Sequence, residues 1–127
     1  MKEFEIYVQN KPGELAKVCE MLGASGVNIR GISSERGHEK SMIKVVTDDE
    51  TTASAVLARS GIAHSARDVM TIKLADRPGE LGKVARKLAR AMVNVDSIYI
   101  IGKEPGMSEI AITVGDRRKA EDALART

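Results

Sequence analysis

The chain has 127 residues, of which 43% are apolar, a composition typical of a folded globular protein and not of a disordered one. Its 20 basic and 18 acidic residues nearly cancel, which argues against the strongly cationic surface of a protein that binds duplex nucleic acid. A single cysteine excludes an intrachain disulfide and a Cys-x-x-Cys site, and neither a signal peptide nor an apolar run of about 20 residues is found, so we expect a cytoplasmic protein without a membrane span.

The chain opens with an alternating apolar pattern, Phe4, Ile6 and Val8, that predicts a strand with one buried face. The turn Pro12-Gly13-Glu14-Leu15 follows. Apolar residues then recur at helical spacing and predict a helix whose core-facing positions are Leu15, Val18, Cys19 and Leu22. We expect Cys19 to be a structural residue, because a free cysteine usually behaves as a small buried hydrophobe.

Gly26 is expected to close this helix in the left-handed conformation, and Val27-Asn28-Ile29 to open a second strand that runs to about Glu35. A charged turn at 36–40 and a third strand around 43–47 follow. The next helix has Asp48 or Asp49 as a candidate N-cap and Gly61 as its C-cap, and 62–67 offers a short fourth strand.

The second half repeats this pattern, first 66 and later 67 residues further on. The corresponding motifs are the strand residues Met70, Ile72 and Leu74, the turn Pro78-Gly79-Glu80-Leu81, the helix positions Leu81, Val84, Ala85 and Leu88, the segment Val93-Asn94-Val95 and the candidate N-cap Asp116. Met92 stands where the first half has Gly26, so we expect the second helix to run further or to end differently. No counterpart of the fourth strand precedes Thr127.

These elements predict an α+β fold of two ferredoxin-like βαββαβ units, residues 1–67 and 68–127, with antiparallel sheets, helices on one face, and a second unit that lacks its last strand. The missing strand would leave one edge of the strand at 69–74 unpaired. Either the fourth strand of the first unit or another chain would cover that edge, and we favour a homodimer.

Asn10-Lys11-Pro12-Gly13-Glu14-Leu15 with Gly26-Val27-Asn28-Ile29 resembles the ACT domain, a regulatory ligand-binding module of amino-acid metabolism, and Asp76-Arg77-Pro78-Gly79-Glu80-Leu81 with Val93-Asn94-Val95 resembles a second copy. The resemblance covers essentially the whole chain and implies that an amino acid or similar effector binds at an interface between units. It maps the ligand contacts onto Asn10, Lys11, Gly13, Glu14, Leu15, Asn28 and Ile29, and onto Asp76, Arg77, Gly79, Glu80, Leu81 and Asn94.

The chemistry of these loops suits such a ligand. A helix start offers unpaired N–H groups and the positive end of the helix dipole to a carboxylate, and glycine permits close approach. The amides of Asn28 and Asn94 can both donate and accept a hydrogen bond. Stability alone would also explain the turn residues, and Leu15 and Leu81 are expected to face the core rather than the ligand.

Other functions of this fold lack the residues they need. RNA recognition requires exposed aromatic side chains, metal carriage requires clustered ligands, and Cys19, His38 and His64 lie apart in the sequence. Arg77 and Asn94 are only a faint match to an acylphosphatase site, and no nucleophile motif occurs, so we expect no enzyme activity, no cofactor and no metal.

Two hypotheses remain. The chain is an amino-acid-binding regulator that senses an effector at an interface between units or chains, or it is an adaptor that docks a partner enzyme of amino-acid metabolism and has degenerate ligand sites.

Overall fold

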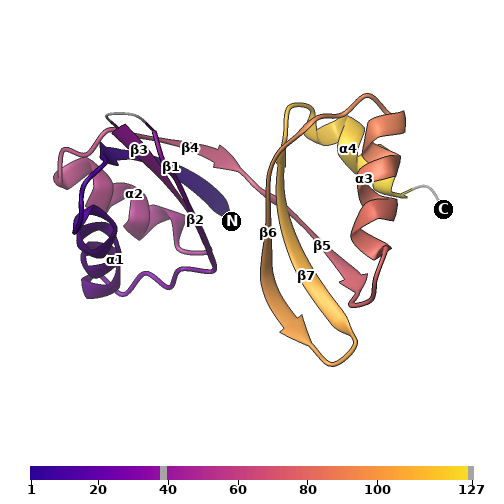
Figure 1. Cartoon of the computed structure of the whole chain (residues 1–127), viewed down its shortest axis with the longest axis horizontal. Helices are drawn as coiled ribbons and strands as arrows, with labels where there is room; N and C mark the ends of the chain where they lie inside the picture. Colours follow the sequence, from indigo (N-terminus) through magenta and orange to yellow (C-terminus); the bar gives the residue numbers. More distant parts are fainter. Residues whose placement is uncertain (38–39, 126–127) are drawn as a thin grey trace. The chain divides into compact units, whose positions relative to one another are not determined.

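The computed structural model describes residues 1–37 and 40–125, and it divides into two compact units, Met1–Asp68 and Val69–Thr127. In each unit two helices cover one face of an antiparallel sheet, which confirms the predicted α+β fold (Figure 1). None of the described helices is long and apolar enough to cross a membrane. His38, in the predicted charged turn, lies outside the described residues.

The first unit is a complete split βαβ arrangement with the strand order β2-β3-β1-β4. The central strand β1 pairs antiparallel with β3 from Lys2 opposite Thr47 to Gln9 opposite Lys40. Its other edge pairs with β4. The elements are β1 (Lys2–Gln9), α1 (Glu14–Ala24), β2 (Gly31–Glu35), β3 (Lys40–Thr47), α2 (Glu50–Arg59) and β4 (His64–Asp68).

The core of this unit lies between the sheet and its two helices. The predicted strand residues Phe4, Ile6 and Val8 are buried there, and α1 contributes Val18 and Leu22. Ile62, just before β4, packs against the same cluster, so the segment that leads into the fourth strand covers part of the core.

The second unit repeats the arrangement with one strand fewer, in the order β5-β7-β6. Its elements are β5 (Met70–Ala75), α3 (Glu80–Arg90), β6 (Val95–Glu104), β7 (Met107–Val114) and α4 (Arg117–Ala125). Within the described residues β5 pairs only with β7, so the missing strand and the open edge predicted from the repeat are both confirmed.

Both first helices end in the same way, against our expectation for Met92. Gly26 has φ 79° and Met92 has φ 59°, and the following residue donates to the carbonyl five residues back, Val27 to Leu22 at 3.0 Å and Val93 to Leu88 at 2.9 Å. This is the Schellman motif, and α1 and α3 each have 11 residues. The prediction of a longer or different helix was wrong, because burial of Val93 holds Met92 in the left-handed region.

The predicted N-caps of the second helices are confirmed. The Asp49 carboxylate accepts a hydrogen bond from the Thr52 N–H at 3.1 Å, and Asp116 accepts from Lys119 at the same distance. The C-cap of α2 is Ser60, and the predicted C-cap Gly61 is the next residue, with φ 66°.

Four residues that the sequence predicts to face the core need correction. Leu15 and Leu81 are 46% and 41% exposed, because each lies in the first turn of its helix, almost a full turn before the core-facing Val18 and Val84. Ala85 is exposed and Cys19 only half-buried.

The second strand also begins later than predicted, at Gly31 rather than Val27. The backbone of 27–28 is engaged elsewhere, since Val27 closes α1 and the Asn28 carbonyl accepts from the Thr47 hydroxyl at 3.0 Å.

Candidate functional site

The first strand-to-helix loop, residues 10–13, joins β1 to α1 and leaves the helix start open. Gly13 is the N-cap residue, with φ 93° and no side-chain cap. The first helical hydrogen bond runs from the Lys17 N–H to the Gly13 carbonyl, so the N–H groups of the first turn precede it. A Cβ at Gly13 would meet nothing within 4 Å, which means that the left-handed backbone, and not crowding, calls for glycine there.

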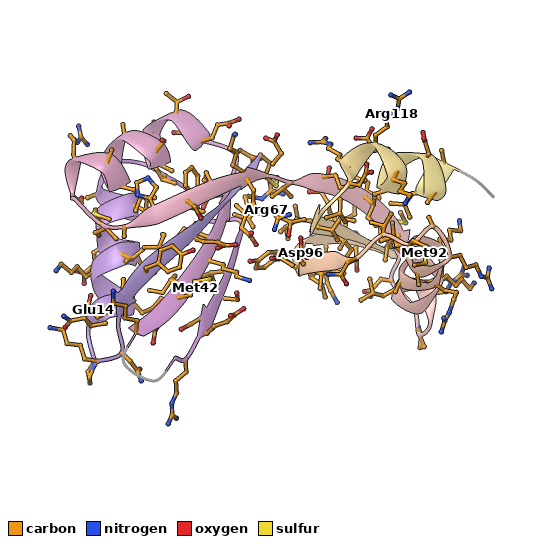
Figure 2. All side chains as sticks on the ribbon, turned by 90° about the horizontal axis from the view of Figure 1, so that it is seen from above. Glu14, Met42, Arg67, Met92, Asp96 and Arg118 are labelled. Carbon is orange, nitrogen blue, oxygen red and sulfur yellow. The ribbon has the colours of Figure 1, made fainter. Side chains whose placement is uncertain are left out.

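Polar contacts tie this loop to the hairpin beside it. The Asn10 side-chain amide donates to the Gly37 carbonyl at 3.3 Å, and Lys11 Nζ lies 3.6 Å from the Glu14 carboxylate. Glu14 starts α1 (Figure 2), and only 17% of its side chain is exposed. Asn10 is thus held by the hairpin that joins β2 and β3.

The second loop, residues 76–79, has the same backbone with different side-chain contacts. Gly79 has φ 88° and also lacks a side-chain cap. Asp76 donates its N–H to the Gly106 carbonyl at 3.0 Å, and its carboxylate lies 3.4 Å from Lys103 Nζ. Both loops are therefore anchored to the neighbouring hairpin.

Glu80 is the most strongly paired residue of the second loop. Its carboxylate accepts hydrogen bonds from Lys83 at 3.2 Å and from Arg77 at 3.1 Å. These bonds, first that from Lys83 and then that from Arg77, lower the pKa of Glu80 below its ordinary value of 4.5. Glu80 is therefore a carboxylate whose negative charge is already matched by two cations.

The two asparagines lie at the other end of each sheet. Asn28 follows the end of α1, and its carbonyl is held by Thr47, the residue opposite Lys2 at the start of β1. Asn94 directly precedes Val95, which pairs with Val114, and its amide donates to Asp96 at 3.1 Å. No hydrogen bond of the Asn28 amide group to another described residue is found.

Strand geometry gives the separation between loop and asparagine within one unit. The loop begins after Gln9, whereas Asn28 lies near the Lys2 end of the same strand. At about 3.3 Å per residue, that length of strand spans roughly 23 Å. The loop and the asparagine of one unit are therefore too far apart to hold one small molecule.

The remaining candidate site residues lie near the loops or the asparagines. Leu15 and Leu81 are exposed beside the loops, and Ile29 is partly buried against the core of the first unit. A shallow cavity of about 210 Å³ lies between Tyr7 and the hairpin residues Arg36, Gly37 and Lys40, next to the Asn10 contact. Among the described residues no group of three or more His, Cys, Asp or Glu side chains could hold a metal ion.

The comparisons with known proteins agree with this arrangement. Residues 2–59 and 69–127 each match the ACT domain family. The chain belongs to the ACT domain family. It is built of two ACT units, which confirms the resemblance of the two turn motifs.

One curated relative is aspartokinase from Corynebacterium glutamicum, which is 30% identical over 111 residues. The match covers 84% of this chain but only 26% of that enzyme, so the chain spans about a quarter of the relative's length.

Two solved structures share the fold. A Bacteroides thetaiotaomicron protein is 22% identical with a TM-score of 0.87, over 98% of this chain and 85% of that one. The ligand-free regulatory subunit of aspartate kinase from Thermus thermophilus is 18% identical with a TM-score of 0.74, over 98% and 87%.

Sequence reasoning missed the groups that hold the site residues. Gly37 and Thr47 fix Asn10 and Asn28, and Lys103 pairs with Asp76. For Thr47 the sequence holds a signal. The repeat matches it to Val114, so the first unit has a hydroxyl group at a position where the second has none.

Proposed function

We propose that this chain is an effector-sensing regulatory protein that binds an amino acid at a site shared between two ACT units. The observation that carries the proposal is the separation of the loop at 10–13 from Asn28 by roughly the length of β1. A complete site then needs the loop of one unit and the asparagine of another.

The two halves have complementary chemistry for an amino acid. The open start of α1 suits the carboxylate, since Gly13 and the first-turn N–H groups stand at the positive end of the helix dipole. The Asn28 amide is exposed and has an oxygen that can accept from the ammonium group. Leu15, exposed beside the loop, would contact the side chain of the ligand.

The relatives support a partner enzyme for this regulator. The matched portion of aspartokinase and the fold shared with a regulatory subunit of aspartate kinase support a kinase of amino-acid synthesis as the regulated protein. On this proposal the chain acts in the cytoplasm as a homodimer and has no catalytic activity of its own. Regulation follows from linkage, because an effector that contacts two units favours their pairing only by its difference in affinity between paired and unpaired states.

A thermal-shift panel of the standard amino acids tests the proposal. A ligand at about 100 times its Kd stabilises a protein by about 2.7 kcal/mol, which raises the Tm of a domain of this size by several degrees. We expect Asn28→Ala and Leu15→Asp to abolish the shift and Arg118→Ala, on the exposed face of α4, to retain it (Figure 2). If no amino acid shifts the wild-type melt, amino-acid sensing is ruled out and the adaptor hypothesis gains.

A further inference from the structure

A buried threonine joins the asparagine of the first unit to the helix that follows β3. Thr47, the last residue of β3, is 0% exposed. Its hydroxyl donates to the Asn28 carbonyl at 3.0 Å and accepts from the Asp49 N–H at 3.2 Å. Asp49 in turn caps α2, because its carboxylate accepts from the Thr52 N–H at 3.1 Å. A continuous line of hydrogen bonds therefore runs from the backbone of Asn28 to the first turn of α2.

The segment around Asn28 is fixed at its backbone and not at its side chain. On one side Val27 closes α1, and on the other the Arg30 N–H donates to the Val46 carbonyl at 2.8 Å. The Thr47 bond holds the backbone between these two points. The Asn28 side chain is exposed, and no hydrogen bond of its amide to another described residue is found. The first unit thus presents this amide to a ligand from a fixed backbone position.

The second unit lacks both features. The repeat matches Thr47 to Val114, a residue without a hydroxyl group that could hold a carbonyl. The Asn94 amide donates to the Asp96 carboxylate at 3.1 Å, so this side chain already has a partner within its own unit. Asp96 lies where the register of β6 shifts against β7, and such an irregularity re-aims the side chain at that point. The two asparagines, which are equivalent in the repeat, therefore differ in their hydrogen bonding.

The position of the Thr47 hydroxyl makes it hard to replace. One oxygen serves both the Asn28 carbonyl and the Asp49 N–H, and linked hydrogen bonds of this kind strengthen one another. Without the hydroxyl, both groups would lose a partner beside a buried side chain, where water restores a hydrogen bond poorly. A ligand would then have to order the backbone of residue 28 as it binds, which weakens its affinity.

We propose that Thr47 is the positioning residue of the effector site. It makes Asn28, and not Asn94, the asparagine that binds the amino acid, and it links a ligand at Asn28 to the start of α2. This inference rests on the proposed function and adds two statements to it. Each chain provides one working asparagine, and α2 is the element that responds to the ligand.

Calorimetric titration of four variants tests the inference, with the amino acid that gives the largest thermal shift and at a temperature where every variant is folded. We expect Thr47→Val to weaken binding by about five- to ten-fold, and Thr47→Ser, which keeps the hydroxyl, to stay within about two-fold of the wild type. Thr113→Val is the matched control, because Thr113 is a buried threonine whose hydroxyl bonds to no described residue. This control and Asn94→Ala should bind like the wild type.

Hydrogen exchange gives a readout that a merely structural role would not move. In the wild type, saturating ligand should slow exchange of the Asp49 and Thr52 amides at the start of α2. In Thr47→Val, saturating ligand should leave the exchange of both amides unchanged, and Thr47→Ser should restore the wild-type response.

The results that would overturn the inference differ from those that would reject the proposed function. Wild-type affinity in Thr47→Val, equal weakening by Thr113→Val, or loss of binding in Asn94→Ala would reject the role of Thr47 while the effector site stands. Ligand-slowed exchange at α2 in Thr47→Val would also reject it. If the wild type binds no amino acid, the proposed function fails and this inference fails with it.

Discussion

At the scale of single residues, the fold overrides the preference of Met92 for a negative φ angle. The left-handed conformation destabilises a non-glycine residue by roughly 1–2 kcal/mol. Met92 (Figure 2) adopts this conformation, with φ 59°, although 84% of its surface is exposed. Since Val93 beside it is buried, the helix end is held in place by the core rather than by the preference of residue 92.

Replacing Met92 with glycine should therefore stabilise the protein. We expect Met92→Gly to raise the free energy of unfolding by about 1 kcal/mol, because it removes the backbone strain and loses almost no packing. The matched change in the first unit, Gly26→Ala, should lower it by about 1 kcal/mol. Urea unfolding of the three proteins measures both effects, and a destabilised Met92→Gly protein would show that the methionine side chain makes contacts that stabilise the fold.

Glu80 makes a pH-dependent contribution that Glu80→Gln should remove. Its folded pKa is lowered, so the stabilisation is fully present above the unfolded value of about 4.5 and is lost as the pH falls through the folded pKa. The difference in Tm between the wild type and Glu80→Gln should be constant at neutral pH and shrink below pH 4.5. Because the carboxylate is solvent-accessible we expect a small effect, and a difference that grows on acidification would contradict this account.

At the scale of elements, the two first helices and strands are close copies in different surroundings. Ile6 is fully buried in the core cluster against which Ile62 packs, whereas Ile72 lines an open groove. Isoleucine at the same structural position is therefore buried to a different extent in the two units.

Truncating both isoleucines should reveal this difference. We expect Ile6→Ala to cost about 4 kcal/mol and Ile72→Ala about 2 kcal/mol, because less apolar surface is removed from the core at the half-covered site. Hydrogen exchange of amides in each sheet measures the loss unit by unit. Equal losses would mean that the groove at β5 is covered in solution.

The repeat predicted most of the elements because its signals are local. Alternation at Phe4, Ile6 and Val8 and the capping residues Asp49 and Asp116 specify a strand and two helix starts within a few residues. The burial of Leu15 could not be predicted in this way, since helical spacing identifies a face but not how far the sheet extends beneath it. The late start of β2 depends on Thr47, a partner distant in the sequence.

At the scale of the whole molecule, the sequence named the candidate residues but not their grouping. Gly13 and Asn28 were both selected by resemblance, and only the register of β1 against β3 shows that they lie at opposite ends of one unit. Grouping depends on strand length and pairing, which composition and motifs do not encode. The separation is what leads us to a site shared between units.

The central claim is that such a shared site binds an amino acid, and mixing two inactive variants tests it most directly. Leu15→Asp disables the loop and Asn28→Ala disables the asparagine, while each leaves the other half intact. Calorimetric titration would use the amino acid that gives the largest thermal shift. For a site between the chains of a dimer, an equimolar, re-equilibrated mixture should regain about one quarter of the wild-type sites, because half of the dimers are mixed and each mixed dimer has one complete site. Wild-type affinity in both single variants, or no recovery in the mixture, would contradict a site formed by the loop and Asn28 of different chains.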